Sequence, residues 1–132
     1  MIKILSFGAG VQSTALLLMS CKGLIDKIDC AIFADTGYEP QKVYDHLKWC
    51  IDYAAKYEIP VHVVKGGEKG IKEDVLKNIP SEKGGRVATL PYFTATVEGK
   101  NLGLGMRQCT SEYKINPIEK FLRQEILGLK PR

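Results

Sequence analysis

The chain has 132 residues, of which 45% are hydrophobic and 26% are charged, a balance typical of one globular domain and not of disordered or collagen-like chains. Its 19 Lys and Arg against 15 Asp and Glu leave a net charge of +4. That charge is too small for a dedicated nucleic-acid binder and suits a small anionic ligand better. No apolar run reaches the roughly 18 residues of a membrane span, and no secretory signal is visible, so we expect a cytoplasmic protein without membrane partners.

The cysteines do not predict a metal or disulfide framework. The four of them are Cys21, Cys30, Cys50 and Cys109, and none forms the Cys-x-x-Cys pair that structural zinc or a redox dithiol needs. We therefore expect no metal ligands among them.

The first half of the chain alternates short apolar runs with helical patterns. Residues 2–5 predict a strand, residues 6–14 a glycine-bearing turn, and the apolar residues that follow a heavily buried helix that ends near Gly23. Residues 30–34 predict a second, fully buried strand, and residues 35–38 a loop. A helix beginning at Glu39 and Pro40 then carries one apolar face, formed by Val43, Leu47, Cys50, Ile51 and Ala54.

The second half is less regular. Residues 60–64 predict a third strand and residues 72–78 a short helix. Residues 81–105 form a glycine-rich segment in which only residues 92–97 resemble a strand, with a hairpin turn at 98–101. Asn116 is the expected N-cap of a last helix, with Pro117 at its first position.

This order of elements predicts an α/β fold. Strands that are continuously apolar and alternate with helices are typical of a parallel sheet covered on both faces. In such folds ligands bind beyond the carboxyl ends of the strands. The loops at residues 6–14 and 35–39 are therefore the expected binding site.

The first loop is suited to phosphate. Gly8 and Gly10 allow close backbone approach, and Gln12, Ser13 and Thr14 add polar groups at the start of a helix. A Walker loop is excluded because Gly-Lys followed by Ser or Thr is absent. A dinucleotide fingerprint fails only at its last glycine, so a Rossmann domain remains an alternative to a pyrophosphate (PP) loop.

Three segments resemble the phosphoadenosine phosphosulfate (PAPS) reductase family of the adenine nucleotide alpha hydrolase-like superfamily, which shares the PP-loop with ATP pyrophosphatases. Residues 6–17 are similar to its first motif, and residues 33–39 to its Asp-Thr-Gly segment. The third motif, Cys-x4-Lys-x2-Pro, is matched by Cys109, Lys114 and Pro117. The three segments span nearly the whole chain, residues 1–132, as a single nucleotide-binding domain.

The resemblance implies a doubly wound parallel sheet with an adenine nucleotide, PAPS, adenosine phosphosulfate (APS) or ATP, across its carboxyl edge. It implies these binding residues: Ser6, Gly8, Gly10, Gln12, Ser13, Asp35, Thr36, Gly37, Arg107, Thr110 and Lys114. Gly8, Gly10, Gln12 and Ser13 would lie near the phosphates, and residues 35–37 near the adenosine. Arg107 and Lys114 would close over the anionic end, and Cys109 is the candidate nucleophile.

The sequence also departs from this family. The chain ends without the Glu-Cys-Gly motif that carries the reductase nucleophile, and Cys109 has no adjacent cysteine, so no iron-sulfur cluster is expected. Gln12 replaces the acid of the Ser-Gly-Gly-x-Asp-Ser loop, which removes a carboxylate that could help hold Mg²⁺. We therefore expect the chain to be a short member of the family or to lack the C-terminal part of the family domain.

Four functions follow from these observations. The first is a sulfonucleotide reductase-like enzyme of sulfur metabolism, which would need a thiol donor protein. The second is a PP-loop ATP pyrophosphatase that adenylates and transfers sulfur, for which Mg²⁺ is needed if ATP is cleaved. The third is a catalytically inactive nucleotide-binding module, and the fourth is a Rossmann dinucleotide-binding domain. Nucleic acid is the least favoured partner.

Overall fold

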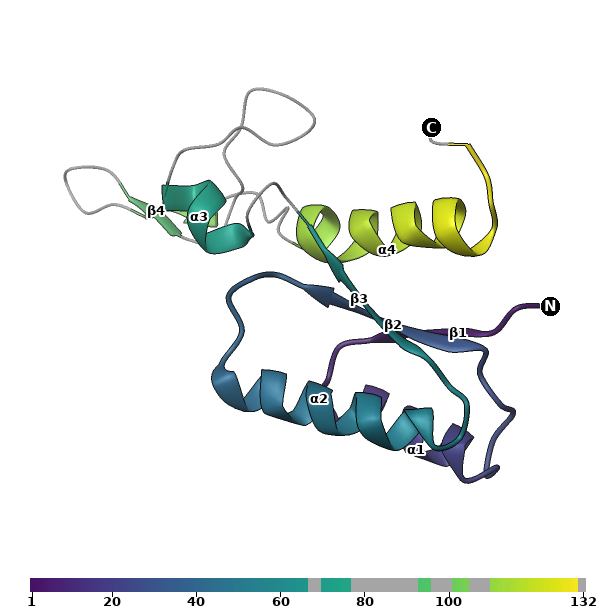
Figure 1. Cartoon of the computed structure of the whole chain (residues 1–132). Coiled ribbons are helices and arrows are strands. Elements are labelled where there is room, and N and C mark those ends of the chain that lie inside the picture. The colour runs from purple at the N-terminus through teal and green to yellow at the C-terminus, as the bar shows by residue number, and fades with distance from the viewer. Residues whose placement is uncertain (67–69, 77–92, 96–100, 105–109, 131–132) are drawn as a thin grey trace.

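The fold is described from a computed structural model, which covers residues 1–66, 70–76, 93–95, 101–104 and 110–130 (Figure 1). The elements are β1 (Ile4–Phe7), α1 (Val11–Cys21), β2 (Cys30–Asp35), α2 (Gln41–Ala55), β3 (Val61–Lys65), α3 (Ile71–Leu76), β4 (Phe93–Ala95), β5 (Asn101–Leu104), η1 (Ser111–Ile115), α4 (Asn116–Phe121) and η2 (Leu122–Ile126). The predicted third strand and the short helix after it are thus confirmed within one residue at their starts.

The main sheet has three parallel strands in the order β1-β2-β3. Ile4 lies opposite Cys30 in the first pair of strands, and Asp35 lies opposite Lys65 in the second. The strands β4 and β5 form a separate antiparallel pair, as the predicted hairpin requires, but β5 begins at Asn101, which was predicted as part of the turn.

Helices cover both faces of the three-stranded sheet (Figure 1). On one face α1 and α2 pack over a core that includes Phe7, Leu17 and Phe33. On the other face the helical segment from η1 to η2 covers Ile32 and Val64 with Phe121 and neighbouring side chains. Every residue of β2 is buried, as the continuous apolar run predicts for the middle strand of a parallel sheet.

The predicted doubly wound order is not shown. Across the parallel sheet, the described strands follow the chain order β1, β2 and β3, and no described strand lies on the other side of β1. A doubly wound sheet needs strands on both sides of its first strand, so that the order reverses there. The structure therefore shows a mixed α/β fold with a small parallel sheet.

The last helix begins earlier than predicted. Asn116 does not cap it, because helical backbone already runs from Ser111 through the wide turn of η1, in which the Asn116 N–H donates to the Ser111 carbonyl five residues before. Pro117 has no N–H to donate, and a wide turn before it accommodates that loss. The cap-like signal thus marks a change of helical pitch within a longer helix.

Helix α1 is buried less completely than its apolar sequence predicts. Leu17 is fully buried, whereas 45% of Leu16 and 37% of Met19 remain exposed. The reason is position, since α1 packs on β1 at the edge of the sheet and only α2 lies beside it among the described elements. No helix in the described ranges is long and apolar enough to cross a membrane.

Candidate functional site

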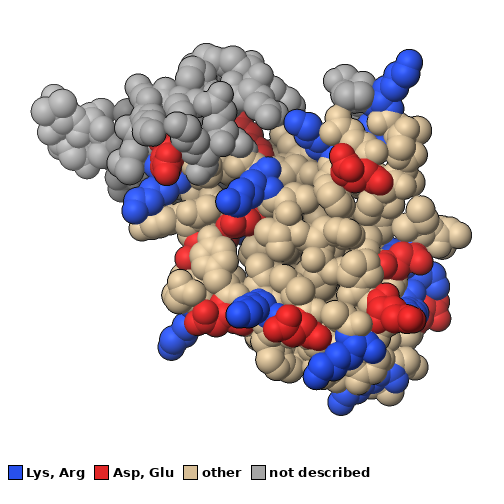
Figure 2. All heavy atoms as spheres, viewed as in Figure 1, with Lys and Arg blue, Asp and Glu red and all other residues tan. Residues whose placement is uncertain are grey.

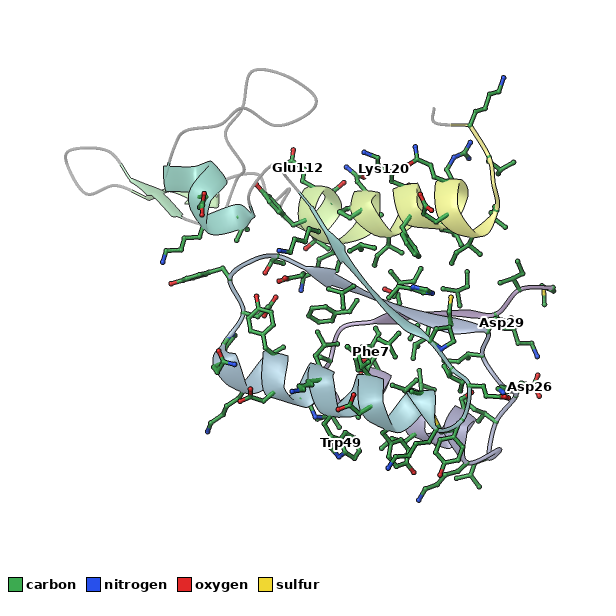
Figure 3. All side chains as sticks on the ribbon, viewed as in Figure 1. Phe7, Asp26, Asp29, Trp49, Glu112 and Lys120 are labelled. Carbon is green, nitrogen blue, oxygen red and sulfur yellow. The ribbon has the colours of Figure 1, made fainter. Side chains whose placement is uncertain are left out.

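The candidate site is the edge of the sheet at which β1, β2 and β3 end. Because the strands are parallel, the loops after Phe7, Asp35 and Lys65 all leave the sheet on this side. The strand residue before the first loop is buried: Phe7 is 1% exposed, and its side chain points from β1 toward the helices below the sheet (Figure 3). The first loop is therefore held at a rigid base.

The first loop is a short turn with an unusual backbone. Ala9 adopts a left-handed conformation (φ 53°), which is uncommon for a residue with a side chain and is found often at functional sites. Gly8 and Gly10 are exposed, and a Cβ added at either would meet no described atom within 4 Å. Packing within the described chain thus does not require glycine at these two positions. A ligand that approaches the backbone would require it.

The turn feeds the N-terminus of α1, which is suited to an anion. The Thr14 N–H donates to the Gly10 carbonyl at 2.9 Å, so the earlier N–H groups of the helix have no partner within it. No side chain caps this end and its first turn holds no acidic residue. The Ser13 hydroxyl donates to the Gly10 carbonyl at 3.2 Å, and Gln12 is exposed. Unpaired N–H groups and the positive end of the helix dipole together favour phosphate.

Thr14, by contrast, does not face a ligand. Its Oγ1 lies 3.0 Å from Nε2 of His46 on α2, and the same nitrogen lies 3.5 Å from the Cys50 sulfur. Burial raises the pKa of the Cys50 thiol, so it stays protonated near neutral pH. These contacts fasten α1 to α2 behind the turn. Sequence reasoning did not connect Thr14 with His46, because they lie on different helices.

Asp35, the last residue of β2, is held by groups from the second loop and from α2. Asp35 is buried, and its Oδ1 accepts hydrogen bonds from the Gly37 N–H and from the Tyr44 hydroxyl, each at 2.8 Å. The Thr36 hydroxyl donates to Glu39 at 3.0 Å. Burial, and then the hydrogen bond to Asp35, raise the pKa of Tyr44, so its hydroxyl remains a donor. Tyr44 was not among the predicted site residues.

The third loop packs against the second. The Ile71 N–H donates to the Thr36 carbonyl at 2.8 Å, and Gly70 has φ 98°, which favours glycine. A Cβ on Gly70 would lie 3.2 Å from the same carbonyl oxygen. The Lys72 ammonium lies 5.5 Å from the centre of the Tyr38 ring, a cation–π contact at the same edge. In the sequence, Gly70 was the only sign that the third loop comes close to the second.

The third predicted motif lies partly at this edge. A Cβ on Gly66 would stand 2.7 Å from Cα of Tyr113, so η1 packs directly on the end of β3 and brings Thr110 and Lys114 to the same side of the sheet. Both residues are exposed. Arg107 and Cys109 lie outside the described residues.

Of the predicted binding residues, the structure brings together those of the first two loops. Gly8, Gly10, Gln12 and Ser13 lie at or just before the start of α1, and Asp35, Thr36 and Gly37 lie at and just after the end of the neighbouring strand β2. Ser6 lies within β1 and is exposed. These seven residues and Ser6 thus belong to two adjacent strands, the loops that follow them and the start of α1.

Neither the distribution of charge nor a cluster of metal-ligating side chains points to a second site in the described ranges. Figure 2 shows lysines, arginines and acids mixed over the described part of the visible face. No group of three or more His, Cys, Asp or Glu side chains that could hold a metal ion occurs in the described ranges.

Comparison of the chain with protein-family models, with curated proteins and with solved structures found no match. The family resemblance therefore remains a hypothesis that depends on the motifs alone.

Proposed function

We propose that this chain binds an adenine nucleotide (PAPS, APS or ATP) at the carboxyl edge of its parallel sheet, as a cytoplasmic PP-loop member of the PAPS reductase family with the adenine nucleotide alpha hydrolase-like fold. The observation that carries the proposal is the uncapped N-terminus of α1 behind a turn with two glycines, at either of which an added Cβ would meet no described atom within 4 Å. The buried Asp35 on the neighbouring strand adds an acceptor for the nucleoside.

Charge supports an anionic ligand at this position. No acidic residue occupies the first turn of α1, and Gln12 there is neutral. Lys65, Lys72 and Lys114 add positive charge on the elements that meet this edge. A phosphate at the helix end would therefore find N–H donors there, and these lysines lie on other elements of the same edge.

The test is calorimetric titration with ATP, APS, PAPS and NADH, each with and without Mg²⁺, on the wild-type chain and on Gln12→Glu. A carboxylate at Gln12 suits the helix dipole, so the variant should fold as well as wild type, yet it repels phosphate. We expect affinity to fall at least tenfold. The control is Gln124→Glu on η2, which changes the net charge equally but lies beyond α4, on the segment that packs near the start of β1.

Three results would contradict the proposal. It fails if none of the adenine nucleotides binds, or if Gln12→Glu and Gln124→Glu weaken binding equally. It also fails in favour of the Rossmann alternative if NADH binds tightly and ATP does not displace it. Selective binding of a sulfated nucleotide would favour the reductase lineage, and Mg²⁺-dependent binding of ATP the pyrophosphatase lineage.

Turnover separates an enzyme from a binding module. The inactive module is favoured by Gln12, which stands at the start of α1 in place of the acid expected there. A reductase would release sulfite from PAPS or APS in the presence of a thiol donor, and a pyrophosphatase would release pyrophosphate from ATP with Mg²⁺. Loss of either activity in Cys109→Ser would show that the chain is an enzyme that uses this thiol.

A further inference from the structure

Tyr44 connects α2 to the buried carboxylate at the end of β2. Its hydroxyl donates to Asp35 Oδ1 at 2.8 Å, and its oxygen accepts the Glu39 N–H at 3.4 Å. The Gly37 N–H donates to the same Asp35 oxygen at 2.8 Å. One oxygen of the carboxylate is thus held by two donors, one from the backbone of its own loop and one from a helix.

This arrangement restricts how the carboxylate can turn. The backbone donor alone would allow Asp35 to act as an ordinary loop residue that satisfies its own turn. The second donor comes from a side chain that is anchored on α2, a helix of the rigid core. Because Oδ1 accepts both of these hydrogen bonds, Oδ2 is the oxygen that a donor from outside the loop would use.

Asp35 stands one strand away from the proposed phosphate position. Phe7 pairs with Phe33, so Asp35 lies two residues further along β2, level with the turn that follows β1. Neighbouring strands are about 4.8 Å apart. A group joined to a phosphate at the start of α1 therefore comes within reach of Asp35, and for the α-phosphate of a nucleotide that group is the sugar.

The chemistry of the carboxylate narrows the ligand further. A carboxylate only accepts hydrogen bonds, so it repels a second phosphate, including the 3′-phosphate on the sugar of PAPS, and favours hydroxyl groups, which donate. It therefore favours ATP or APS over PAPS. We infer that Tyr44 is a positioning residue that holds Asp35 to accept hydrogen bonds from the sugar hydroxyls of the bound nucleotide. This inference rests on the proposed function and assigns sugar selection to a residue outside the three motifs.

The experiment compares three probes by calorimetry: ATP, 2′,3′-dideoxy-ATP, which lacks the sugar hydroxyls, and tripolyphosphate, which lacks the nucleoside. Wild type should prefer ATP over the dideoxy form by about tenfold or more, because hydrogen bonds to charged groups are strong. Tyr44→Phe should reduce that preference to less than about threefold and leave tripolyphosphate affinity unchanged. A residue with a merely structural role would weaken all three probes alike.

Tyr53→Phe is the matched control. Tyr53 lies on the same helix, and its hydroxyl is 3.3 Å from the Tyr57 hydroxyl at an exposed position. It should leave the preference for ATP unchanged. Asp35→Ala provides a second variant: it should abolish the preference by itself, and adding Tyr44→Phe to it should have no further effect on the ratio.

The outcomes separate this inference from the proposed function. If wild type binds all three probes but does not prefer ATP, or if Tyr44→Phe leaves the preference intact, Tyr44 does not position Asp35 for the sugar and nucleotide binding still stands. Independent, additive effects of the two substitutions on the ratio would also overturn the inference. If wild type binds neither ATP nor tripolyphosphate, the proposed function fails, and this inference fails with it.

Discussion

Replacement of Gly8 by Ala should separate ligand binding from stability. The glycine is exposed, its φ does not lie in the left-handed region, and an added Cβ would meet no described atom within 4 Å. An Ala at such a position restricts the unfolded chain and stabilises the fold by about 0.4–1 kcal/mol. The same methyl group would stand in front of the turn, where the backbone is proposed to approach phosphate.

The expected shift in melting temperature follows from the size of the chain. For 132 residues, an unfolding entropy of about 2.1 cal/mol/K per residue gives roughly 0.28 kcal/mol/K. The stabilisation of Gly8→Ala therefore corresponds to a rise of about 1–4 °C in Tm. Affinity for ATP should fall about tenfold, the equivalent of one lost hydrogen bond to a charged group. Thermal denaturation followed by circular dichroism, together with calorimetric titration, measures both quantities.

Gly66→Ala is the contrasting control. A Cβ there would lie 2.7 Å from Cα of Tyr113 and 2.9 Å from the carbonyl oxygen of Glu112, and neither backbone atom can move aside cheaply. Overpacking of this kind costs about 1–3 kcal/mol, or roughly 4–11 °C in Tm. A fall in Tm for Gly8→Ala would refute the reasoning that packing leaves this glycine free. An unchanged affinity would show that the ligand does not approach the turn.

Three further outcomes follow from the core and the titrating groups. Leu17→Ala, which empties a fully buried position under the sheet, should lower the free energy of unfolding by about 2–5 kcal/mol in a urea titration, and a loss under 1 kcal/mol would contradict this packing. The hydrogen bond from Lys3 lowers the pKa of Asp26 in the folded state. The ionised Asp26 therefore contributes to stability at neutral pH, and this contribution is lost as the pH falls through the lowered pKa. Lys3→Ala should remove this acid-dependent part of the free energy of unfolding, measured between pH 6 and pH 2. The buried Cys50, whose pKa is raised by burial, should resist alkylation at pH 7 until the protein is unfolded, as peptide mass spectrometry can detect, and rapid labelling of the native chain would place it elsewhere.

The predicted elements that are confirmed have local causes. Residues 30–34 are apolar at every position, and such a run is stable only as a strand buried on both faces, which is where β2 lies. The apolar face of α2 was predicted from helical spacing, and Leu47, Cys50 and Ala54 are indeed buried against the sheet. These patterns depend on neighbours within one or two turns of the chain.

The predictions that were wrong concern where the last helix begins and how far α1 is buried. Asn116 and Pro117 form a local cap-like signal, but the residues before them are already helical in η1, which packs against the end of β3. The apolar composition of α1 predicts burial on all sides, yet Leu16 and Met19 are exposed, since the helix lies over an edge strand. The start of the last helix and the exposure of α1 both depend on contacts with other elements and not on local helix propensity. The sequence pattern therefore could not predict them.

By itself the sequence determined the alternation of strands and helices and the glycine turn that precedes α1, because apolar period, glycine and helix formers act over a few residues. Only the tertiary structure decided the one-directional order of the sheet, the bond between Thr14 and His46, and the hold of Tyr44 on Asp35. Such contacts join residues on different elements. They form only when the helices and strands pack against one another, and this packing depends on residues that are far apart in the sequence.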